Sequence, residues 1–478
     1  MKFSEVYEVK RANDQEWFDP ILSHDTRLFI DPLLIESYPD PPFNDARQLL
    51  QEFFDFAFRE AAATTWSDTN PRFRRLLSML VFPEVKELCL GYTARSAEGL
   101  GGSKQVARLI AEGIYDSLAA GIDSLERFEE VALLKDNIGA DRISDMTANI
   151  LRRQLAEYTL AVCRRNRVRV ERFHFPKGFF NFKTVRWEPL EIELPVNPLA
   201  PVRRAVLLVP KQLLQKLPSI NYKDFGDYLS QTHNEELRDE FGLDVKEGLD
   251  KPSIIEIAKR KWGWVKEYVL RFPVRSRGPY DLGRDPSKLY RWYSAGVAFG
   301  QSNPLPEPKP TSDADFVGFI DELIDWFKRG VEGSGLWRLL WNDNGPPKDE
   351  RSAQALFFAV THGYCRMNNI DITPEAETGR GPVDFKFSNG FARRVHVEVK
   401  LASNRKLEHG VTVQVPTYMQ ADQVQHGRVV VVAHYEELRD AVANRLRIWL
   451  RQVRGVDLQG IVVSAVKPPS ASRSRRRR

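Results

Sequence analysis

Apolar positions in the last third of the chain follow the period of a helix in some segments and that of a strand in others. Helical spacing predicts helices over residues 348–364 and 436–451, and a short helix or turn over residues 413–422. Alternating or continuous β-branched runs predict strands over residues 383–387, 394–401, 428–434 and 458–466. Helices and strands in this order are typical of an α/β sandwich with a central mixed sheet.

A proline-rich segment precedes this region. Prolines recur at alternate positions between Asn303 and Thr311, which denies the segment the hydrogen bonds of both helix and strand. We therefore expect a linker over residues 303–311 and a C-terminal domain over residues 312–467. Ser312 has the pattern of a helix N-cap with Asp315 at the third helical position, so a helix should begin directly after the linker.

The N-terminal region, residues 1–302, is larger, and we expect a mixed α+β structure there. A division into two subdomains near residues 165–200 is one interpretation, and a role in recognising a substrate, signal or partner is the expected function. Asp19 and Asp31 each precede a proline. Together with Asp25 they could form a second acidic site, but Asp-Pro is foremost a turn signal, so turns are the favoured interpretation.

Composition and charge change this picture little. The chain has 478 residues with 42% apolar content, enough for two or three globular domains, and its net charge of +5 is compatible with a polyanionic partner. Its three cysteines lie far apart, as is typical of proteins in a reducing compartment. We find neither a signal-peptide pattern nor an apolar run of membrane-spanning length, and expect a soluble, cytoplasmic protein without a membrane partner.

Two stretches of the N-terminal region combine cations with aromatic rings. Cations bind phosphates and flat rings stack on unpaired bases, so either stretch could track nucleic acid. The alternative is a set of strands with aromatic cores and solvated edges. The candidate residues are Arg164, Arg165 and Arg167 in the first stretch, and Lys259, Arg260, Lys261, Trp262 and Trp264 in the second. The arginine-rich tail, residues 468–478, should be disordered and bind nucleic acid non-specifically.

The most specific chemistry lies in two consecutive predicted strands. Asp384 lies in the first, and Glu398 and Lys400 lie two residues apart in the second. Side chains alternate across a strand, so Glu398 and Lys400 share one face with His396, for which we expect a hydrogen-bonded surface position. Asp384 precedes Glu398 by 398 − 384 = 14 residues, which leaves room for a turn at residues 388–390 between antiparallel strands.

Two carboxylates and an amine near one point suit phosphodiester hydrolysis. Carboxylates hold a hard divalent cation such as Mg²⁺ or Mn²⁺, and an ammonium group can orient a water molecule and offset negative charge on a phosphate. A Glu-x-Lys triplet alone is common on solvated strand faces, so the inference depends on the combination with Asp384 and with the order of the elements.

At these residues the chain resembles the PD-(D/E)XK nuclease superfamily, also called restriction-endonuclease-like. Asp384 matches the first metal-binding aspartate of that superfamily, and Glu398-Val399-Lys400 matches its (D/E)XK element. One departure is that the proline lies two residues before Asp384 instead of one. The resemblance covers the C-terminal third of the chain, from Lys348 onward, and implies a restriction-endonuclease-like fold.

Further positions extend the resemblance. Glu350 matches an acid that the family often carries on the helix before the sheet, with Asp349 as a neighbouring candidate and a dipole-stabilised acid at a helix start as the alternative. Gln414 and Tyr418 match a glutamine and tyrosine of the RecB-like branch. They would hold the metal site or the substrate backbone, and a helix that merely packs on the sheet is the alternative.

The resemblance implies a metal-dependent nuclease. Asp384, Glu398 and Glu350 would bind Mg²⁺ or Mn²⁺, and Lys400 would position the attacking water. We expect nucleic acid, with DNA favoured, as the substrate, a homo-oligomer or a partner subunit as an option, and a role in bacterial antiviral defence or restriction. The alternative is a catalytically inactive nuclease-fold scaffold that binds nucleic acid or a partner protein.

Overall fold

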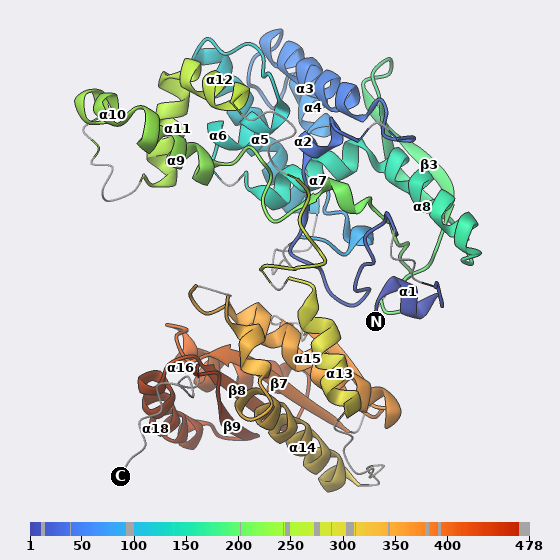
Figure 1. Ribbon diagram of the computed structural model, residues 1–478, viewed down its shortest axis with the longest axis vertical. Helices are drawn as coiled ribbons and strands as arrows, with labels where there is room; N and C mark the ends of the chain where they lie inside the picture. Colours follow the sequence, from blue (N-terminus) through green and yellow to red (C-terminus); the bar gives the residue numbers. More distant parts are fainter. Residues whose placement is uncertain are drawn as a thin grey trace. The chain divides into compact units, whose positions relative to one another are not determined.

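The computed structural model describes residues 1–10, 15–38, 40–91, 100–136, 138–200, 202–241, 243, 249–271, 278–287, 289–302, 310, 312–342, 345–377, 382–390 and 393–467. The chain forms two compact units, Met1–Tyr280 and Asp281–Arg478 (Figure 1). The expected linker lies outside the described residues except for Pro310, and the expected basic tail lies outside them entirely.

The first unit is mainly helical. Its helices are α1 (Phe3–Val6), α2 (Pro32–Ile35), α3 (Ala46–Ala62), α4 (Pro71–Met79), α5 (Leu100–Ala119), α6 (Val131–Leu134), α7 (Ala140–Ile150), α8 (Arg152–Asn166), α9 (Tyr222–Thr232), α10 (Asn234–Phe241), α11 (Lys251–Arg260) and α12 (Trp262–Leu270). Its described residues also form two antiparallel sheets of two strands each: β1 (Phe29–Ile30) with β4 (Leu214–Gln215), and β2 (Glu171–Asn181) with β3 (Arg186–Leu194). The β2–β3 hairpin, near which a subdomain division was one interpretation, packs on α7 and α8.

The two Asp-Pro aspartates of this unit accept hydrogen bonds from distant segments, and Asp31 also caps a helix. The Asp19 carboxylate accepts hydrogen bonds from the backbone N (2.9 Å) and Oγ (2.7 Å) of Ser4. Asp31 is the N-cap of α2, where its Oδ1 accepts from the N–H of Leu33 (3.1 Å). Its Oδ2 accepts from the backbone N and Oγ of Ser219. Each carboxylate therefore ties together segments distant in sequence.

The second unit contains a mixed sheet of five strands, which confirms the expected α/β class with a central mixed sheet. The strands lie in the order β5 (Asp371–Glu377), β6 (Pro382–Ser388), β7 (Arg394–Leu401), β8 (His426–Ala433) and β9 (Asp457–Ser464). The first three strands are antiparallel to one another, and β7, β8 and β9 are parallel. Strand β5 was not predicted, because its sequence is polar and contains Pro374; an edge strand tolerates such a proline.

Helices flank this sheet (Figure 1). They are α13 (Arg291–Ser302), α14 (Asp313–Glu332), η5 (Leu336–Leu340), α15 (Glu350–Met367), α16 (Leu407–His409), the π-helical turn η6 (Gly410–Gln414), α17 (Val415–Ala421) and α18 (Glu436–Gln452). Two apolar cores result. One joins α14 and α15 to the face of the sheet that carries Val395, Val397 and Val399 of β7. The other joins α16, α17 and α18 to the opposite face of the sheet, which carries Val429 and Val431 of β8.

Helix α14 begins where the sequence predicts. Ser312 is its N-cap: Ser312 Oγ accepts from the N–H of Asp315 (3.1 Å), and Asp315 Oδ2 accepts from the N–H of Ser312 (3.0 Å). This capping box satisfies two backbone donors that the helix start would otherwise leave open. Further along α14, Lys328 Nζ donates to the carbonyl of Val462 in the edge strand β9 (3.0 Å), which protects part of that edge.

Within the described parts of the chain, no helix combines the length and the apolar character needed to cross a bilayer.

Candidate active site

The candidate site forms where strands β6 and β7 separate. Their pairing runs from Ser388 opposite Arg394 to Phe385 opposite Val397. The turn between them contains Gly390 with a φ of 79°, a left-handed conformation that glycine adopts without strain. Beyond Phe385, two backbone N–H groups donate to carboxylates of the opposite strand. Glu398 Oε2 accepts from the N–H of Asp384 (3.0 Å), and Asp384 Oδ2 accepts from the N–H of Val399 (2.9 Å). The two acids therefore face each other across the pair of strands.

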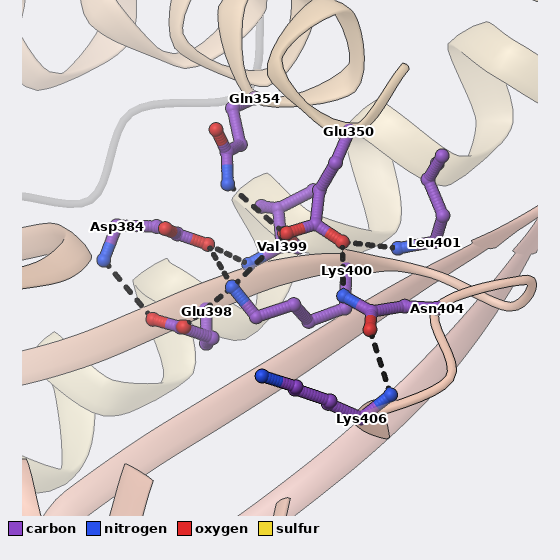
Figure 2. A network of polar contacts seen from close by, with 9 residues as sticks. All are labelled: Glu350, Gln354, Asp384, Glu398, Val399, Lys400, Leu401, Asn404 and Lys406. Carbon is purple, nitrogen blue, oxygen red and sulfur yellow. Dashed lines mark hydrogen bonds and ion pairs between the residues drawn. The ribbon is translucent and has the colours of Figure 1, made fainter. Parts of the chain in front are cut away.

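Three carboxylates from three elements converge on the ammonium group of Lys400 (Figure 2). Its Nζ lies 2.7 Å from Glu398 Oε1, 3.2 Å from Glu350 Oε1 and 3.3 Å from Asp384 Oδ2. Glu350 begins α15, Asp384 lies in β6, and Glu398 and Lys400 lie in β7. Four of the residues singled out in the sequence are thus in direct contact.

Asp349 and Glu350, the two rival acids at the start of α15, have different contacts. Asp349 Oδ1 accepts from the backbone N (3.1 Å) and the Oγ (2.9 Å) of Ser352, which is the contact of a helix cap. Glu350 Oε2 accepts from the N–H of Leu401 (3.1 Å) and the side-chain amide of Asn404 (2.9 Å), while its Oε1 faces Lys400. Of the two acids, Glu350 is the one in contact with Lys400.

Burial controls the electrostatics of the site. The side chains of Asp384, Glu398 and Lys400 are no more than 5% exposed. Burial raises the pKa of Glu398 to about 7, and the neighbouring Asp384 adds to this shift while Lys400 opposes it. Burial alone would lower the pKa of Lys400, but the three carboxylates raise it above its ordinary value. Lys400 therefore stays an ammonium ion at neutral pH, and Glu398 titrates near neutrality.

The donors at this site suit Mg²⁺ or Mn²⁺, although their present spacing suits an ammonium ion. Within the described residues, no group of three or more His, Cys, Asp or Glu side chains has the arrangement of a formed metal site. Here the oxygens lie 2.7 to 3.3 Å from Nζ. Mg²⁺ takes oxygen ligands at about 2.0–2.1 Å, so these carboxylates would have to draw closer around it. Carboxylate oxygens are nevertheless the ligands that both ions prefer.

Gln414 and Tyr418 lie on the same side of the sheet as Glu398 and Lys400. Gln414 ends η6, Tyr418 lies in α17, and α17 packs on β6 and β8. Asp422, the C-cap of α17, lies 2.9 Å from His396 Nε2 on that face of β7. The segment therefore covers the face that carries the site, with Val415 and Met419 in the core.

His396 is fully buried, so the expectation of a surface histidine is wrong. Its exposed fraction is 0%, because the end of α17 covers this part of β7. Burial lowers the pKa of His396, and its partner Asp422 opposes that shift. The same Asp422 carboxylate also pairs with Lys386 Nζ (2.7 Å) and with an Arg394 guanidinium nitrogen (3.2 Å). These contacts join α17 to β6 and β7.

Among the described residues, the side chains of Gln354 and Asn404 also contact the site, and neither was singled out in the sequence. Gln354 lies one helical turn after Glu350 and donates to the carbonyl of Val399 (3.3 Å), between Glu398 and Lys400. Asn404 links Glu350 to the loop after β7. The four-residue spacing from Glu350 is a signal that could have identified Gln354. Asn404 carried a weaker signal, as an Asn shortly after the end of a predicted strand, where turns are common.

The first candidate nucleic-acid stretch lies at the end of α8 and in β2. Arg164, Arg165 and Arg167 are exposed, and Arg165 lies 3.9 Å from the equally exposed Glu16. Arg167 is the C-cap of α8. Of the aromatic residues that follow, Phe173, Phe175 and Phe180 are buried, and Phe179 and Phe182 are partly buried.

The second candidate stretch forms helices α11 and α12, where the alternative interpretation expected strands. Each of its three cations has an acidic partner within the first unit. The ion pairs are Lys259 with Asp116 (2.7 Å), Lys261 with Glu240 (2.6 Å) and Arg260 with Glu256 (3.4 Å). A polyanion would compete with these acids for the same cations.

The two indoles of that stretch contact other side chains of the unit. Trp264 stacks on His233 with ring centroids 4.0 Å apart and an angle of 11° between the planes. Trp262 is partly buried and packs against the core formed by α9, α11 and α12. Their packing agrees with an aromatic core.

Comparison with protein families identifies two regions of the chain. Residues 8–221 match a family described as a domain of unknown function (DUF8370), and residues 316–436 match another described as a domain of unknown function (DUF8371). No curated protein and no solved structure matches the chain. The second match includes every residue of the candidate site, from Glu350 to Tyr418, so a single family covers the whole site.

Proposed function

We propose that the second unit is a metal-dependent nuclease of the PD-(D/E)XK, restriction-endonuclease-like type, which hydrolyses phosphodiester bonds of nucleic acid, with DNA as the favoured substrate. The observation that carries this proposal is the convergence of Glu350, Asp384 and Glu398 on Lys400, from one helix and two strands. The mixed five-stranded sheet with helices on both faces supports the same type of fold.

The charges at the site favour a cation-dependent reaction over a purely structural ion pair. When Glu398 is ionised, a single lysine does not balance the three carboxylates, and the buried Asp384 and Glu398 are costly to hold without matching positive charge. Glu350, Asp384 and Glu398 would hold Mg²⁺ or Mn²⁺, which when bound activates water and offsets charge on the phosphate. Lys400 would move from the carboxylates to donate hydrogen bonds to the attacking water and to a phosphate oxygen.

The remaining polar contacts keep these groups in place. Gln354 holds the carbonyl of Val399, which lies between the acid and the lysine of the Glu-x-Lys element. Glu350 holds the backbone N–H of Leu401, the residue after Lys400. Both contacts fix the position of β7 relative to α15, and precise placement of reacting groups is a large part of catalysis.

A cleavage assay tests this proposal. The full-length protein, Asp384→Asn and Lys400→Ala are each incubated with single- and double-stranded DNA and RNA, with Mg²⁺, Mn²⁺ or EDTA. We expect the unmodified protein to cut with Mg²⁺ or Mn²⁺ and not with EDTA, and both variants to lose activity by at least about a hundredfold. Asp384→Asn preserves the shape of the side chain, so a loss of activity in this variant would show that the negative charge of Asp384 is required.

The control for this assay is Arg447→Ala, which removes an exposed cation from α18 in the same unit. It should cut like the unmodified protein. Equal cleavage by all four proteins would identify a contaminant and refute the assignment. Tight binding that needs no metal and leads to no cleavage would instead favour the inactive scaffold.

A further inference from the structure

We propose that the loop over residues 402–406, directly after β7, holds the phosphate backbone of the substrate strand beside the acidic site, through Arg405 and Lys406. The inference rests on the proposed function and adds to it the way in which a polyanion is retained next to three carboxylates. The ligand is the phosphodiester backbone of a polynucleotide.

The loop has a defined shape because both of its ends are anchored. At its start, the N–H of Ala402 donates to the carbonyl of Val432 in β8 (2.9 Å). At its end, Leu407, the first residue of α16, is buried in the core, and its N–H donates to the carbonyl of Asn404 (3.0 Å). Within the loop, Asn404 Oδ1 accepts from the N–H of Lys406 (2.9 Å), which fixes the backbone on either side of Arg405.

The same loop is tied to the candidate site by one carboxylate. Glu350 Oε2 accepts from the Asn404 side-chain amide, and Glu350 Oε1 contacts the Lys400 ammonium group (Figure 2). Arg405 is therefore the next residue after one that contacts a site carboxylate. Oε1 of Glu350 contacts Lys400, and Oε2 contacts Asn404. A cation bound at Oε1 would therefore leave the hydrogen bond between Oε2 and the loop in place.

Arg405 and Lys406 are available for a ligand. Both are exposed, and among the described residues neither forms an ion pair. In the view of Figure 2, the Lys406 side chain extends from the loop in the direction of Glu398. Lys259 and Lys261 differ in this respect, because each already has an acidic partner. Binding a phosphate at the loop would require no ion pair to break.

The positive charges of Arg405 and Lys406 would offset the repulsion between the site carboxylates and a polyanion. The carboxylates of Glu350, Asp384 and Glu398 repel an approaching polyanion, and positive charge directly beside them offsets that repulsion. Phosphates follow one another along a nucleic-acid strand, so a strand with one phosphate at the site has neighbouring phosphates at its rim. Arg405 and Lys406 directly follow Asn404, whose side chain contacts the site carboxylate of Glu350.

A salt series measures this interaction directly. Fluorescent single- and double-stranded DNA and RNA oligonucleotides are titrated with the full-length protein in EDTA, at several salt concentrations. For Arg405→Ala with Lys406→Ala, the slope of log affinity against log salt should become shallower by about 1 per residue, or about 2 in total. The matched control is Arg445→Ala with Arg447→Ala, which removes two exposed cations of α18 and should leave the slope unchanged.

A second measurement separates this inference from the proposed function. With Mg²⁺ or Mn²⁺, the loop variant should show a raised KM for an oligonucleotide but an unchanged rate with bis(p-nitrophenyl) phosphate, which has no neighbouring phosphates. If the loop variant matches the unmodified protein in both slope and KM, the inference is refuted. If the unmodified protein cuts neither substrate, the proposed function fails, and the salt series still decides whether the loop binds phosphates.

Discussion

Neighbouring residues of similar chemistry have different roles at the start of α15. Asp349 lies before the helix, and its short side chain caps it through Ser352. Glu350 has a longer side chain, which reaches Lys400 and the loop after β7. The contacts of the capping Asp349 lie within its own helix. The contacts of Glu350 form only when α15 packs against β7.

The raised pKa of Glu398 predicts a pH-dependent local stability. The pKa of this carboxyl rises from an ordinary 4.5 to about 7 in the folded protein. Folding therefore favours the protonated form, so the contribution of Glu398 to stability is fully present below pH 4.5 and is lost as the pH rises through 7. Hydrogen exchange of peptides that span β6 and β7, measured in EDTA, should show less protection at pH 8 than at pH 5.5.

Glu398→Gln provides the control, because an amide does not titrate. After correction for the intrinsic pH dependence of exchange, its protection should change little over the same range. Excess Mg²⁺ should reduce the decline in the unmodified protein, since a divalent cation stabilises the ionised carboxylate. A decline of equal size in both proteins would show that another group is responsible.

Element by element, the second unit shows where local sequence is sufficient. The start of α14 follows from Ser312 and Asp315 alone, because a capping box is complete within four residues. Strand β8 is buried along nearly its whole length, as its continuous β-branched run predicts. Strand β5 has no such signal, since its strand character comes from pairing with β6.

The cap of α14 leads to a stability prediction. Ser312→Ala removes the oxygen that accepts from the N–H of Asp315, and loss of such a cap costs about 0.5–2 kcal/mol. Hydrogen exchange in the first two turns of α14 should accelerate accordingly. Asp325→Ala, an exposed substitution in the middle of the same helix, should leave the exchange at its start unchanged. Equal exchange in the Ser312→Ala variant and the unmodified protein would show that the cap contributes little.

At the scale of the whole molecule, the chain consists of two units with separate cores. The second unit begins before the proline-rich segment, because α13 packs on α15. The two helices approach closely: a Cβ placed on Gly296 would lie 2.5 Å from the Cβ of Ala359. Phe299 adds an aromatic contact with Trp326 of α14, with ring centroids 5.9 Å apart. Helix α13 therefore belongs to the same packed body as the candidate site.

Two fragments test this division. A fragment of residues 281–478 should unfold at a clearly higher temperature than one of residues 312–478, because the shorter fragment leaves the α13-facing side of α15 exposed to water. Differential scanning calorimetry measures both midpoints. Equal midpoints would mean that α13 contributes little to the stability of this unit. In the longer fragment, Gly296→Leu should lower the midpoint, since the large side chain cannot fit against Ala359.

Features that depend on near neighbours could be predicted from the order of the residues. The periods of the helices and strands, the cap at Ser312, and the antiparallel pair that brings Asp384 to Glu398 all follow from spacing along the chain. A strand alternates its side chains whatever surrounds it, so the shared face of Glu398 and Lys400 was also predictable.

Which groups are buried and which are paired became known only from the folded structure. It brought Glu350 rather than Asp349 to Lys400, joined Asn404 of the loop after β7 to Glu350, and enclosed His396 under the end of α17. These outcomes depend on contacts between segments that are far apart along the chain. The pattern of a single segment does not identify the segments that will pack against it. Burial, charge pairing and pKa values are therefore set only when the sheet and its helices have assembled.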